Sequence, residues 1–371
     1  MKIRSLIIDL SPLTSLPVTG IGKILLGLIE ELKNRDDVRP SYFALVARGL
    51  LPQLRSRYPG LHAPAIPARL SKRALRMIQG LGIPIETFCP KADGVVSADW
   101  LCLPSRRGKS IAIVADATPL TNPQWQRKEN IDLFARRLAS IKRNADLVVA
   151  ISESTRNDLI NTVKLDAERI MVAYPGVSKI FLKKQTAKDI SRVKKKYRLP
   201  AEFLLFVGTQ EPRKNLKNIF SAWSALDKSE KKGTHLILAG QKGWERSLTA
   251  PAQVRKFGFV ADADLPAIYT LARGLIYPSL KEGFGFPILE AFQMGVPVLT
   301  SDRSSMKEIA GDAAILVNPD SVDDLKHGLV RLLALSQAQR ENFILAGKKR
   351  LRNFSFKTMA DKILERVGNS E

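Results

Sequence analysis

The 371-residue sequence has only two cysteines and three histidines. Cys89 and Cys102 lack metal-ligand spacing, and two cysteines do not form a disulfide framework, so a small metal- or disulfide-stabilised scaffold is excluded. Long hydrophobic runs are also missing, since the densest one, residues 24–29, is far too short to span a bilayer. Near the N-terminus, Asp9 interrupts the apolar core that a signal peptide needs. We therefore expect a first strand there, in a protein of the reducing cytosol.

Acidic residues are scarce relative to basic ones, 36 against 59, which gives a net charge of +23. Such a chain is attracted to polyanions such as nucleic acid, an anionic membrane or a phosphorylated substrate. Residues 39–85 contain eight arginines and lysines and no Asp or Glu, interleaved with leucines. This pattern fits a helix lying on an anionic bilayer, and it fits equally a solvated basic face over ordinary core leucines.

Strands alternate with helices along the chain, which is typical of parallel sheets covered by helices. The first predicted strands are residues 2–9, 42–47, 110–115, 147–151 and 170–173. After a lysine-rich connection at 183–200, the predicted strands are 203–207, 235–239, 256–260, 275–277 and 296–300. We expect an α/β protein with two doubly wound domains and a cleft between them, where ligands bind beyond the carboxyl ends of the strands.

Residues 278–300 combine a glycine-rich turn with a helix start. The EGFG sequence at 282–285 follows a short buried strand and lets the backbone approach a ligand closely. Pro287 suits the first turn of a helix that carries Glu290. The helix N-terminus offers amides to an anion, and each carboxylate can accept from vicinal hydroxyls of a sugar or ribose. We expect Glu282 and Glu290 to face one ligand from two sides, although each residue type is also ordinary in a loop or helix.

A second turn of this kind follows the predicted strand at 203–207. The sequence GTQEPRKN at 208–215 places Arg213 and Lys214 where the loop meets the next helix. Two cations and the helix dipole at one point can neutralise a pyrophosphate. In so basic a chain, adjacent cations are often plain surface residues. The second glycine turn in the same predicted domain favours the functional interpretation.

Together, the two motifs resemble those of a large enzyme family. GTxEPRKN followed by PSLxEGFGxPxLEA is similar to the retaining, nucleotide-sugar-dependent glycosyltransferases of the GT-B fold (glycosyl transferases group 1, family 4), and most similar to their mannosyltransferase-like branch. TGIG at 19–22, ISES at 151–154 and FSF at 354–356 extend the resemblance over nearly the whole chain. It implies a Rossmann-like acceptor-side domain at 1–182, a nucleotide-sugar-binding domain at 201–352 and a helix at 353–371 that returns to the N-terminal domain.

The resemblance also implies a role for each matching residue. Arg213 and Lys214 would bind the donor diphosphate and stabilise the leaving nucleoside diphosphate. Glu290 would accept from the ribose hydroxyls, Glu282 would contact the donor sugar, and Asp116 would serve the acceptor side. Gly20 and Gly22 would let the backbone of the N-terminal domain come close to the diphosphate. The amides of Gly283, Phe284 and Gly285 would surround the sugar and phosphate. Phe259 and Val260 would line the base.

The implied reaction retains the anomeric configuration, and the enzyme contributes mainly positioning and charge stabilisation. No cofactor and no metal are expected if Arg213 and Lys214 neutralise the departing diphosphate. The sequence Asp262-Ala-Asp264 matches the pattern by which another glycosyltransferase fold binds a metal. Because it precedes an apolar helix, we expect Asp264 to cap that helix.

One departure from the family pattern lies directly before Asp116. Many relatives have a histidine there that meets the donor sugar, whereas this chain has Ala115. The three histidines, at 62, 235 and 327, match no motif of the family. Either Asp116 alone serves the acceptor side, or the chain is a weak or inactive member.

We therefore expect a hexosyltransferase that uses GDP-mannose to extend a surface or lipid-linked glycan, with an anionic membrane surface as a partner. A UDP- or dTDP-sugar donor and a non-catalytic subunit are alternatives within the same fold. A nucleic-acid-binding protein is the alternative of a different class. The low aromatic content and the lack of a groove-reading or stacking motif argue against it.

Overall fold

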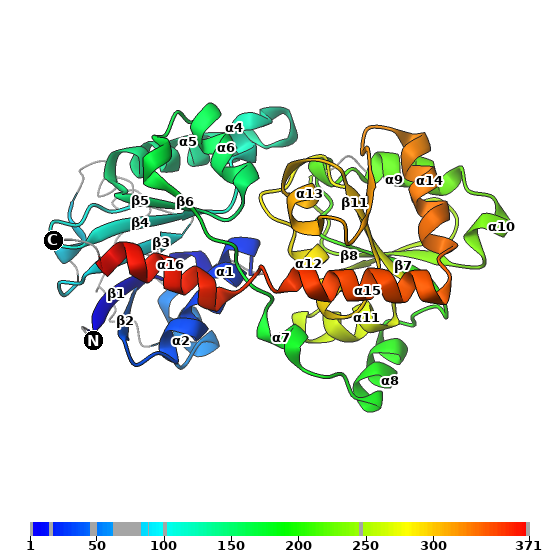
Figure 1. Cartoon of the computed structure of the whole chain (residues 1–371), viewed down its shortest axis with the longest axis horizontal. Coiled ribbons are helices and arrows are strands. Elements are labelled where there is room, and N and C mark those ends of the chain that lie inside the picture. The colour runs from blue at the N-terminus through cyan, green and yellow to red at the C-terminus, as the bar shows by residue number, and fades with distance from the viewer. Residues whose placement is uncertain are drawn as a thin grey trace. The chain divides into compact units, whose positions relative to one another are not determined.

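The computed structural model describes residues 3–14, 18–44, 50–61, 83–87, 89–98, 102–244 and 248–368. The chain forms two compact units. Unit 1 consists of Met1–Gly176 and Ser355–Glu371, and unit 2 is the continuous stretch Val177–Phe354. The boundary therefore lies before the predicted one at residue 182. Each unit is a helix-covered parallel sheet, which confirms the predicted fold class (Figure 1).

Within the described part of the chain, unit 1 has a six-stranded sheet in the order β2-β1-β3-β4-β5-β6. All its neighbouring strands are parallel. Its strands are β1 (Arg4–Asp9), β2 (Val38–Phe43), β3 (Gly94–Ala98), β4 (Lys109–Val114), β5 (Leu147–Ala150) and β6 (Ile170–Val172). Its helices are α1 (Gly20–Lys33), α2 (Leu50–Arg57), α4 (Thr118–Thr121), α5 (Lys128–Asn144), α6 (Glu153–Asn161) and α16 (Phe356–Gly368).

Strand β3 is not among the predicted strands, although it lies between β1 and β4. Its five residues are all buried, and so short an apolar run cannot be told from a piece of buried helix by its periodicity. The second strand also ends earlier than predicted, at Phe43. Residues 45–49 and 62–82 of the basic stretch 39–85 lie outside the described residues, so the predicted bilayer helix there stays a prediction.

The last helix of the chain, α16, packs in unit 1 beside α1 (Figure 1). The ring of Phe356 occupies the space where a side chain of Gly27 would lie. Lys362 donates from its Nζ to the carbonyl of Val172 at 2.9 Å, which ties α16 to the edge strand β6. Glycine at position 27 thus permits the close approach of the two helices.

Unit 2 contains a second six-stranded sheet among its described residues, in the order β12-β11-β10-β7-β8-β9. Its strands are β7 (Phe203–Val207), β8 (His235–Ala239), β9 (Val254–Gly258), β10 (Gly274–Tyr277), β11 (Val298–Ser301) and β12 (Ile315–Val317). Its helices are α7 (Lys179–Leu182), α8 (Ala187–Lys196), α9 (Leu216–Ser224), α10 (Lys228–Lys231), α11 (Leu265–Leu271), α12 (Phe286–Gln293), α13 (Ser304–Ala310), α14 (Val322–Leu333) and α15 (Gln337–Leu351).

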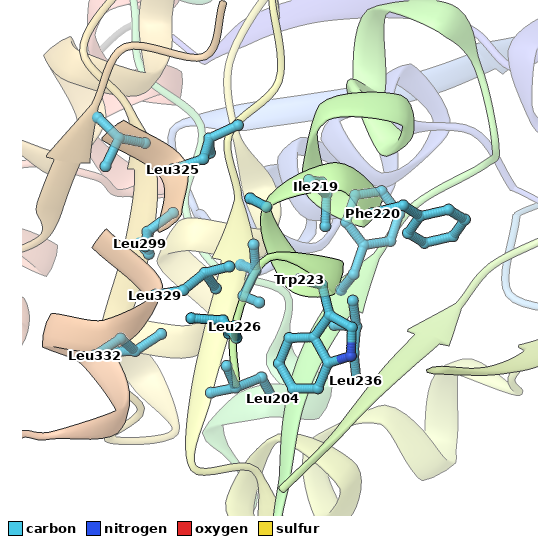
Figure 2. Packing of buried hydrophobic residues seen from close by; sticks show 14 of the residues in the cluster. Leu204, Ile219, Phe220, Trp223, Leu226, Leu236, Leu299, Leu325, Leu329 and Leu332 are labelled. Carbon is cyan, nitrogen blue, oxygen red and sulfur yellow. The ribbon is translucent and has the colours of Figure 1, made fainter. Parts of the chain in front are cut away.

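The core of unit 2 lies between one face of its sheet and the helices α9 and α14. Figure 2 shows Trp223 of α9 among Leu204 and Leu236 of the sheet, with Leu329 and Leu332 of α14 close by. Trp223 is fully buried, and its indole N–H donates to the carbonyl of Ala252 at 3.1 Å. A large buried aromatic whose polar atom is satisfied fixes the register of helix on sheet, and with it the loops at the strand ends.

The basic segment predicted as an inter-domain connection, 183–200, belongs to unit 2. Its helix α8 begins with a capping box, in which Thr186 and Asp189 bond each other's backbone amides. Val193 is buried where α8 packs on α11. No helix in the described part of the chain is long and apolar enough to cross a membrane.

Candidate functional site

The junction between β7 and α9 carries the predicted phosphate-binding cations. A single 3-10 turn, Pro212–Lys214, leads to Asn215, whose left-handed backbone (φ 62°) redirects the chain into α9. Asparagine tolerates this conformation better than most residues. Its Nδ2 donates to the carbonyls of Pro278 at 3.2 Å and Pro319 at 2.7 Å. The junction is thereby held against the loop that follows β10.

The glycine-rich turn after β10 is fixed through its backbone. The hydroxyl of Ser305 donates to the carbonyls of Glu282 at 2.8 Å and Phe284 at 2.6 Å. The amide of Leu280 donates to the carbonyl of Arg213 at 2.8 Å, so this turn and the β7–α9 junction bond each other directly. Gly285, with φ 131°, occupies a conformation that favours glycine and leads into α12.

The side chain of Glu282 lies between both cations and is only 6% exposed. Its Oε1 accepts from Lys214 Nζ at 2.5 Å and from the Tyr277 hydroxyl at 2.9 Å. Its Oε2 pairs with the guanidinium of Arg213. Lys214 Nζ also donates to the Tyr277 hydroxyl at 2.6 Å. The structure thus brings Arg213, Lys214 and Glu282 together and adds Tyr277, which the sequence analysis does not single out.

The protonation of this cluster follows from its charges. Burial by itself would raise the pKa of Glu282, but Arg213 and Lys214 outweigh it and lower the pKa to about 2. Burial, the charge of Glu282 and a smaller contribution from Glu290 raise the pKa of Tyr277 well above 10. At neutral pH the cluster therefore holds an ionised carboxylate and a protonated tyrosine that donates to it.

The second predicted carboxylate, Glu290, is oriented by a different tyrosine. Glu290 lies in α12, is 4% exposed and accepts from the Tyr269 hydroxyl at 2.8 Å through its Oε2. Tyr269 comes from α11 and is fully buried. Burial, followed by the charge of Glu290, raises the pKa of Tyr269 well above 10, so this hydroxyl also stays protonated. Each predicted ligand carboxylate is thus positioned by a buried tyrosine.

The predicted base-lining residues lie just after β9, which spans Val254–Gly258 and so ends before the predicted residue 260. Phe259 is 56% exposed, whereas Val260 is buried. An exposed ring is available for stacking, while Val260 supports the loop from within. Phe284 is buried against Phe354, with ring centroids 5.9 Å apart, so only its backbone remains a candidate for ligand contact.

Unit 1 holds the other predicted site residues. Asp116 follows β4 and is half-buried, and its Oδ1 accepts from the amide of Thr118 at 3.1 Å. Gly20 and Gly22 lie in the first turn of α1. The space beside Gly22 is filled by Val18, where an added Cβ would approach Cγ1 at 2.7 Å. Gly22 is therefore required by packing within the unit, while Gly20 is exposed at the helix start.

The prediction that Asp264 caps a helix is wrong. It occupies the position before α11, but its side chain makes no capping bond. Its carboxylate instead accepts from Arg192 at 2.8 Å, Lys196 at 2.7 Å and the Tyr197 hydroxyl at 2.9 Å. Two cations of α8 and the hydroxyl of Tyr197, which follows α8, bind this carboxylate more strongly than a backbone amide at the helix start would. Among the described residues, no group of three or more His, Cys, Asp or Glu side chains is placed to hold a metal ion.

The chain is similar to known proteins in both sequence and structure. The family described as "Glycosyl transferases group 1" matches residues 187–350. O-antigen chain mannosyltransferase B of Escherichia coli is 31% identical over 263 residues, which cover 68% of either chain. The serotype-specific mannosyltransferase WbdA of Escherichia coli is 31% identical over 246 residues, or 63% of this chain. The match spans only 30% of the length of WbdA.

Solved structures share the fold over the whole chain. HepE of Anabaena, crystallised with UDP and glucose, aligns with a TM-score of 0.71 at 17% identity, covering 99% of this chain and 100% of HepE. WaaG, a glycosyltransferase involved in lipopolysaccharide biosynthesis, aligns with a TM-score of 0.70 at 15% identity, covering 98% of this chain and 100% of WaaG. The two motifs, the two parallel sheets and the sequence match to mannosyltransferase B all agree. The chain therefore belongs to the group 1 glycosyltransferases of the GT-B fold.

Proposed function

We propose that this glycosyltransferase moves mannose from GDP-mannose to a glycan or lipid-linked acceptor in the synthesis of a surface polysaccharide such as lipopolysaccharide. The observation that carries the proposal is the buried cluster of Arg213, Lys214 and Glu282 at the carboxyl ends of β7 and β10. Such a cluster combines cations for a diphosphate with a carboxylate for sugar hydroxyls. The names of the relatives, O-antigen and serotype-specific mannosyltransferases, favour mannose as the sugar.

In the proposed reaction, the acceptor hydroxyl attacks the anomeric carbon on the face from which the nucleotide leaves, so the configuration is retained. Arg213 and Lys214 stabilise the negative charge that develops on the departing diphosphate, and this charge stabilisation replaces a metal. Glu290 holds the ribose and Glu282 the sugar, with the amides of Gly283, Phe284 and Gly285 as further donors. Phe259 stacks on the base, with Val260 beneath the loop.

Unit 1 supplies the acceptor side in this proposal. Asp116 at the end of β4 accepts from the acceptor hydroxyl, and the exposed amide end of α1 at Gly20 attracts the diphosphate. Gly22 supports the same diphosphate contact indirectly, because its lack of a side chain lets Val18 pack against the first turn of α1. Ala115 directly precedes Asp116, so Asp116 acts without the histidine that the resemblance implies for many relatives at this position.

A UDP-sugar donor is the second candidate, because HepE was solved with UDP and glucose. A thermal-shift titration with GDP, UDP, dTDP and ADP separates the candidates. A ligand at about a hundred times its dissociation constant adds roughly 2.7 kcal/mol to the stability of the folded protein. GDP alone should raise the melting temperature clearly, and a shift with UDP alone would replace GDP-mannose by a UDP-sugar.

The control variant must not leave a buried charge unpaired. Arg213→Gln/Lys214→Met/Glu282→Gln removes both cations and their carboxylate partner together, so its folding can be checked by its own melting temperature. It should respond to none of the nucleotides. Equal shifts in this variant and the wild-type protein would show that the nucleotide binds elsewhere, and no shift in either would favour a non-catalytic subunit.

A lipid-linked acceptor would place the enzyme in the cytoplasm, peripherally on the inner face of the membrane. The high net charge of +23 supports this location. Flotation with liposomes tests it, since binding should require anionic lipid.

A further inference from the structure

The segment that joins the sheet of unit 2 to unit 1 is the most basic stretch in the described part of unit 2. Residues 179–198 contain nine lysines and arginines and a single acidic residue, Asp189. The Asp189 carboxylate is already engaged, since its Oδ2 accepts from the Thr186 hydroxyl at 2.6 Å and from the Thr186 amide at 3.2 Å. Nine cations against one carboxylate leave the segment strongly positive.

Helix α8 is held in a fixed rotation against the body of unit 2. Val193 is buried, and the carboxylate of Asp264, just before α11, binds Arg192 and Lys196. The ring of Tyr197 stacks on Phe257 with centroids 5.8 Å apart. These contacts use one side of the helix and two of its cations. The opposite side must then point away from the unit.

That outer side carries exposed lysines. Residues two apart on an α-helix point to nearly opposite sides, so Lys195 lies opposite the buried Val193, and Lys188 lies two turns before Lys195 on the same side. Lys183, Lys184 and Lys194 extend the exposed set. None of these five lysines forms an ion pair with another described residue. Leu182, at the end of α7, is 58% exposed beside them.

We propose that this surface, made of Leu182 and the five exposed lysines at 183, 184, 188, 194 and 195, docks unit 2 on a bilayer that contains anionic lipids. Lysines arranged on one side of a helix complement the negative headgroups, and Leu182 can enter the boundary between headgroups and acyl chains. The proposal rests on the membrane location proposed above and names the part of the chain that makes the contact.

The same charges could attract nucleic acid, but the segment lacks the other half of such a site. Its aromatic residues are not available for stacking on bases, because Phe181 is 3% exposed and Tyr197 already stacks on Phe257. The exposed apolar group is an aliphatic one, Leu182, which suits lipid. The chemistry of the surface thus favours a bilayer over a polynucleotide.

The test is co-flotation of the full chain with phosphatidylglycerol/phosphatidylcholine vesicles at physiological salt. Each lysine near an anionic surface contributes roughly a fivefold factor in the partition coefficient, so replacing all five with glutamine should reduce binding on the order of a hundredfold or more. Leu182→Ser should reduce it by a smaller factor. All the altered side chains are exposed, so the melting temperature and the nucleotide response should not change.

A matched control removes the same charge elsewhere in unit 2. Lys217, Lys228, Lys232, Lys348 and Lys349 are also exposed, and their glutamine variants lower the net charge equally. This control should retain most of its vesicle binding. Equal loss in both variants would overturn the proposal in favour of a non-specific charge effect.

Two further outcomes would also overturn it. If the five-lysine variant still floats like the wild-type protein, the membrane location survives, and the basic stretch at 39–85 becomes the contact. If no form of the protein prefers anionic vesicles and the five-lysine variant instead loses retention on a single-stranded polynucleotide, the surface is a nucleic-acid site.

Discussion

The ammonium group of Lys214 lies 2.5 Å from a carboxylate oxygen of Glu282, and both side chains are buried. A cation proposed to bind phosphate thus has an anionic partner within the protein. A diphosphate must compete with this carboxylate, unless donor sugar hydroxyls offer the carboxylate new partners. The pairing therefore favours the complete nucleotide sugar over the free nucleoside diphosphate.

The variant Glu282→Gln leaves two cations without their internal counter-ion, so its folding is first checked by its melting temperature. The folded variant should bind free GDP more tightly, by about tenfold. Sugar transfer by the same variant should fall. Isothermal titration with GDP measures the first effect and a transfer assay the second. Glu341→Gln, an equal charge change at an exposed site of α15, should alter neither. Weaker GDP binding by Glu282→Gln would mean that the carboxylate does not compete with the diphosphate.

Replacing Tyr269 with phenylalanine removes the hydroxyl that orients Glu290. If Glu290 holds the ribose equally well in the bound and transition states, the KM for the donor should rise about tenfold while kcat changes little. Steady-state kinetics with varied donor separates the two constants. Tyr42→Phe is the matched control, because the buried Tyr42 hydroxyl has no hydrogen-bond partner in the described part of the chain. A fall in kcat at constant KM would assign Tyr269 to the transition state instead.

Asp9 makes the stability of unit 1 depend on pH. Burial raises its pKa from 3.8 to about 6, against hydrogen bonds from Ser11, of which the amide one is 2.9 Å long. The folded protein therefore holds a proton that the unfolded chain has lost, and the associated stability is lost as pH rises from about 4 through about 6. Cys89, the thiol beside it, has a pKa of about 11 and stays neutral across this window.

Asp9→Asn keeps an oxygen for Ser11 and has no charge to bury. It should stabilise the protein at pH 7.5 by on the order of 2–3 kcal/mol, and the gain should vanish near pH 4. Chemical denaturation at several pH values measures this difference. Asp36→Asn, at an exposed position, should give a small difference at every pH. A gain for Asp9→Asn that did not vary with pH would show that the carboxyl does not titrate in this range.

Gly27→Ala should loosen the packing of α16 on α1. The new methyl group would overlap the ring of Phe356, and overpacking of this kind costs about 1–3 kcal/mol, more than the helix propensity gained from alanine. Limited proteolysis should then cleave α16 faster than in the wild-type protein. Gly60→Ala is the control, because its Cβ would meet only the flexible end of Lys33. Unchanged proteolysis in Gly27→Ala would mean that α16 shifts to accommodate the methyl group.

The fold and the grouping of the site are largely predictable from the sequence, because both depend on local patterns. Short apolar strands followed by glycine turns identify the ends of β7 and β10, and sheet geometry then brings Arg213, Lys214 and Glu282 to one edge. The tyrosine partners are not predictable in the same way. Tyr269 reaches Glu290 from another helix, and only the packing of α11 on α12 decides this contact.

The wrong prediction for Asp264 and the packing role of Gly22 both come from contacts that the local pattern does not show. Asp264 lies before a helix, which is a local signal for a cap, but cations of α8 that lie about seventy residues earlier in the sequence take its carboxylate. Gly22 is part of a motif, yet its nearest neighbour is Val18 of its own unit. Long-range contacts can override a local preference without leaving a trace in the pattern around the residue.

The placement of α16 in unit 1 has a consequence for biosynthesis. Unit 2 is one uninterrupted stretch, Val177–Phe354, so its chain is complete before the residues of α16 are synthesised. Unit 1 begins first, but its α1 surface around Gly27 stays uncovered until Phe356–Gly368 have been synthesised. The half of the protein that is made first is therefore finished last, and its exposed helix face is where a chaperone would be needed during translation.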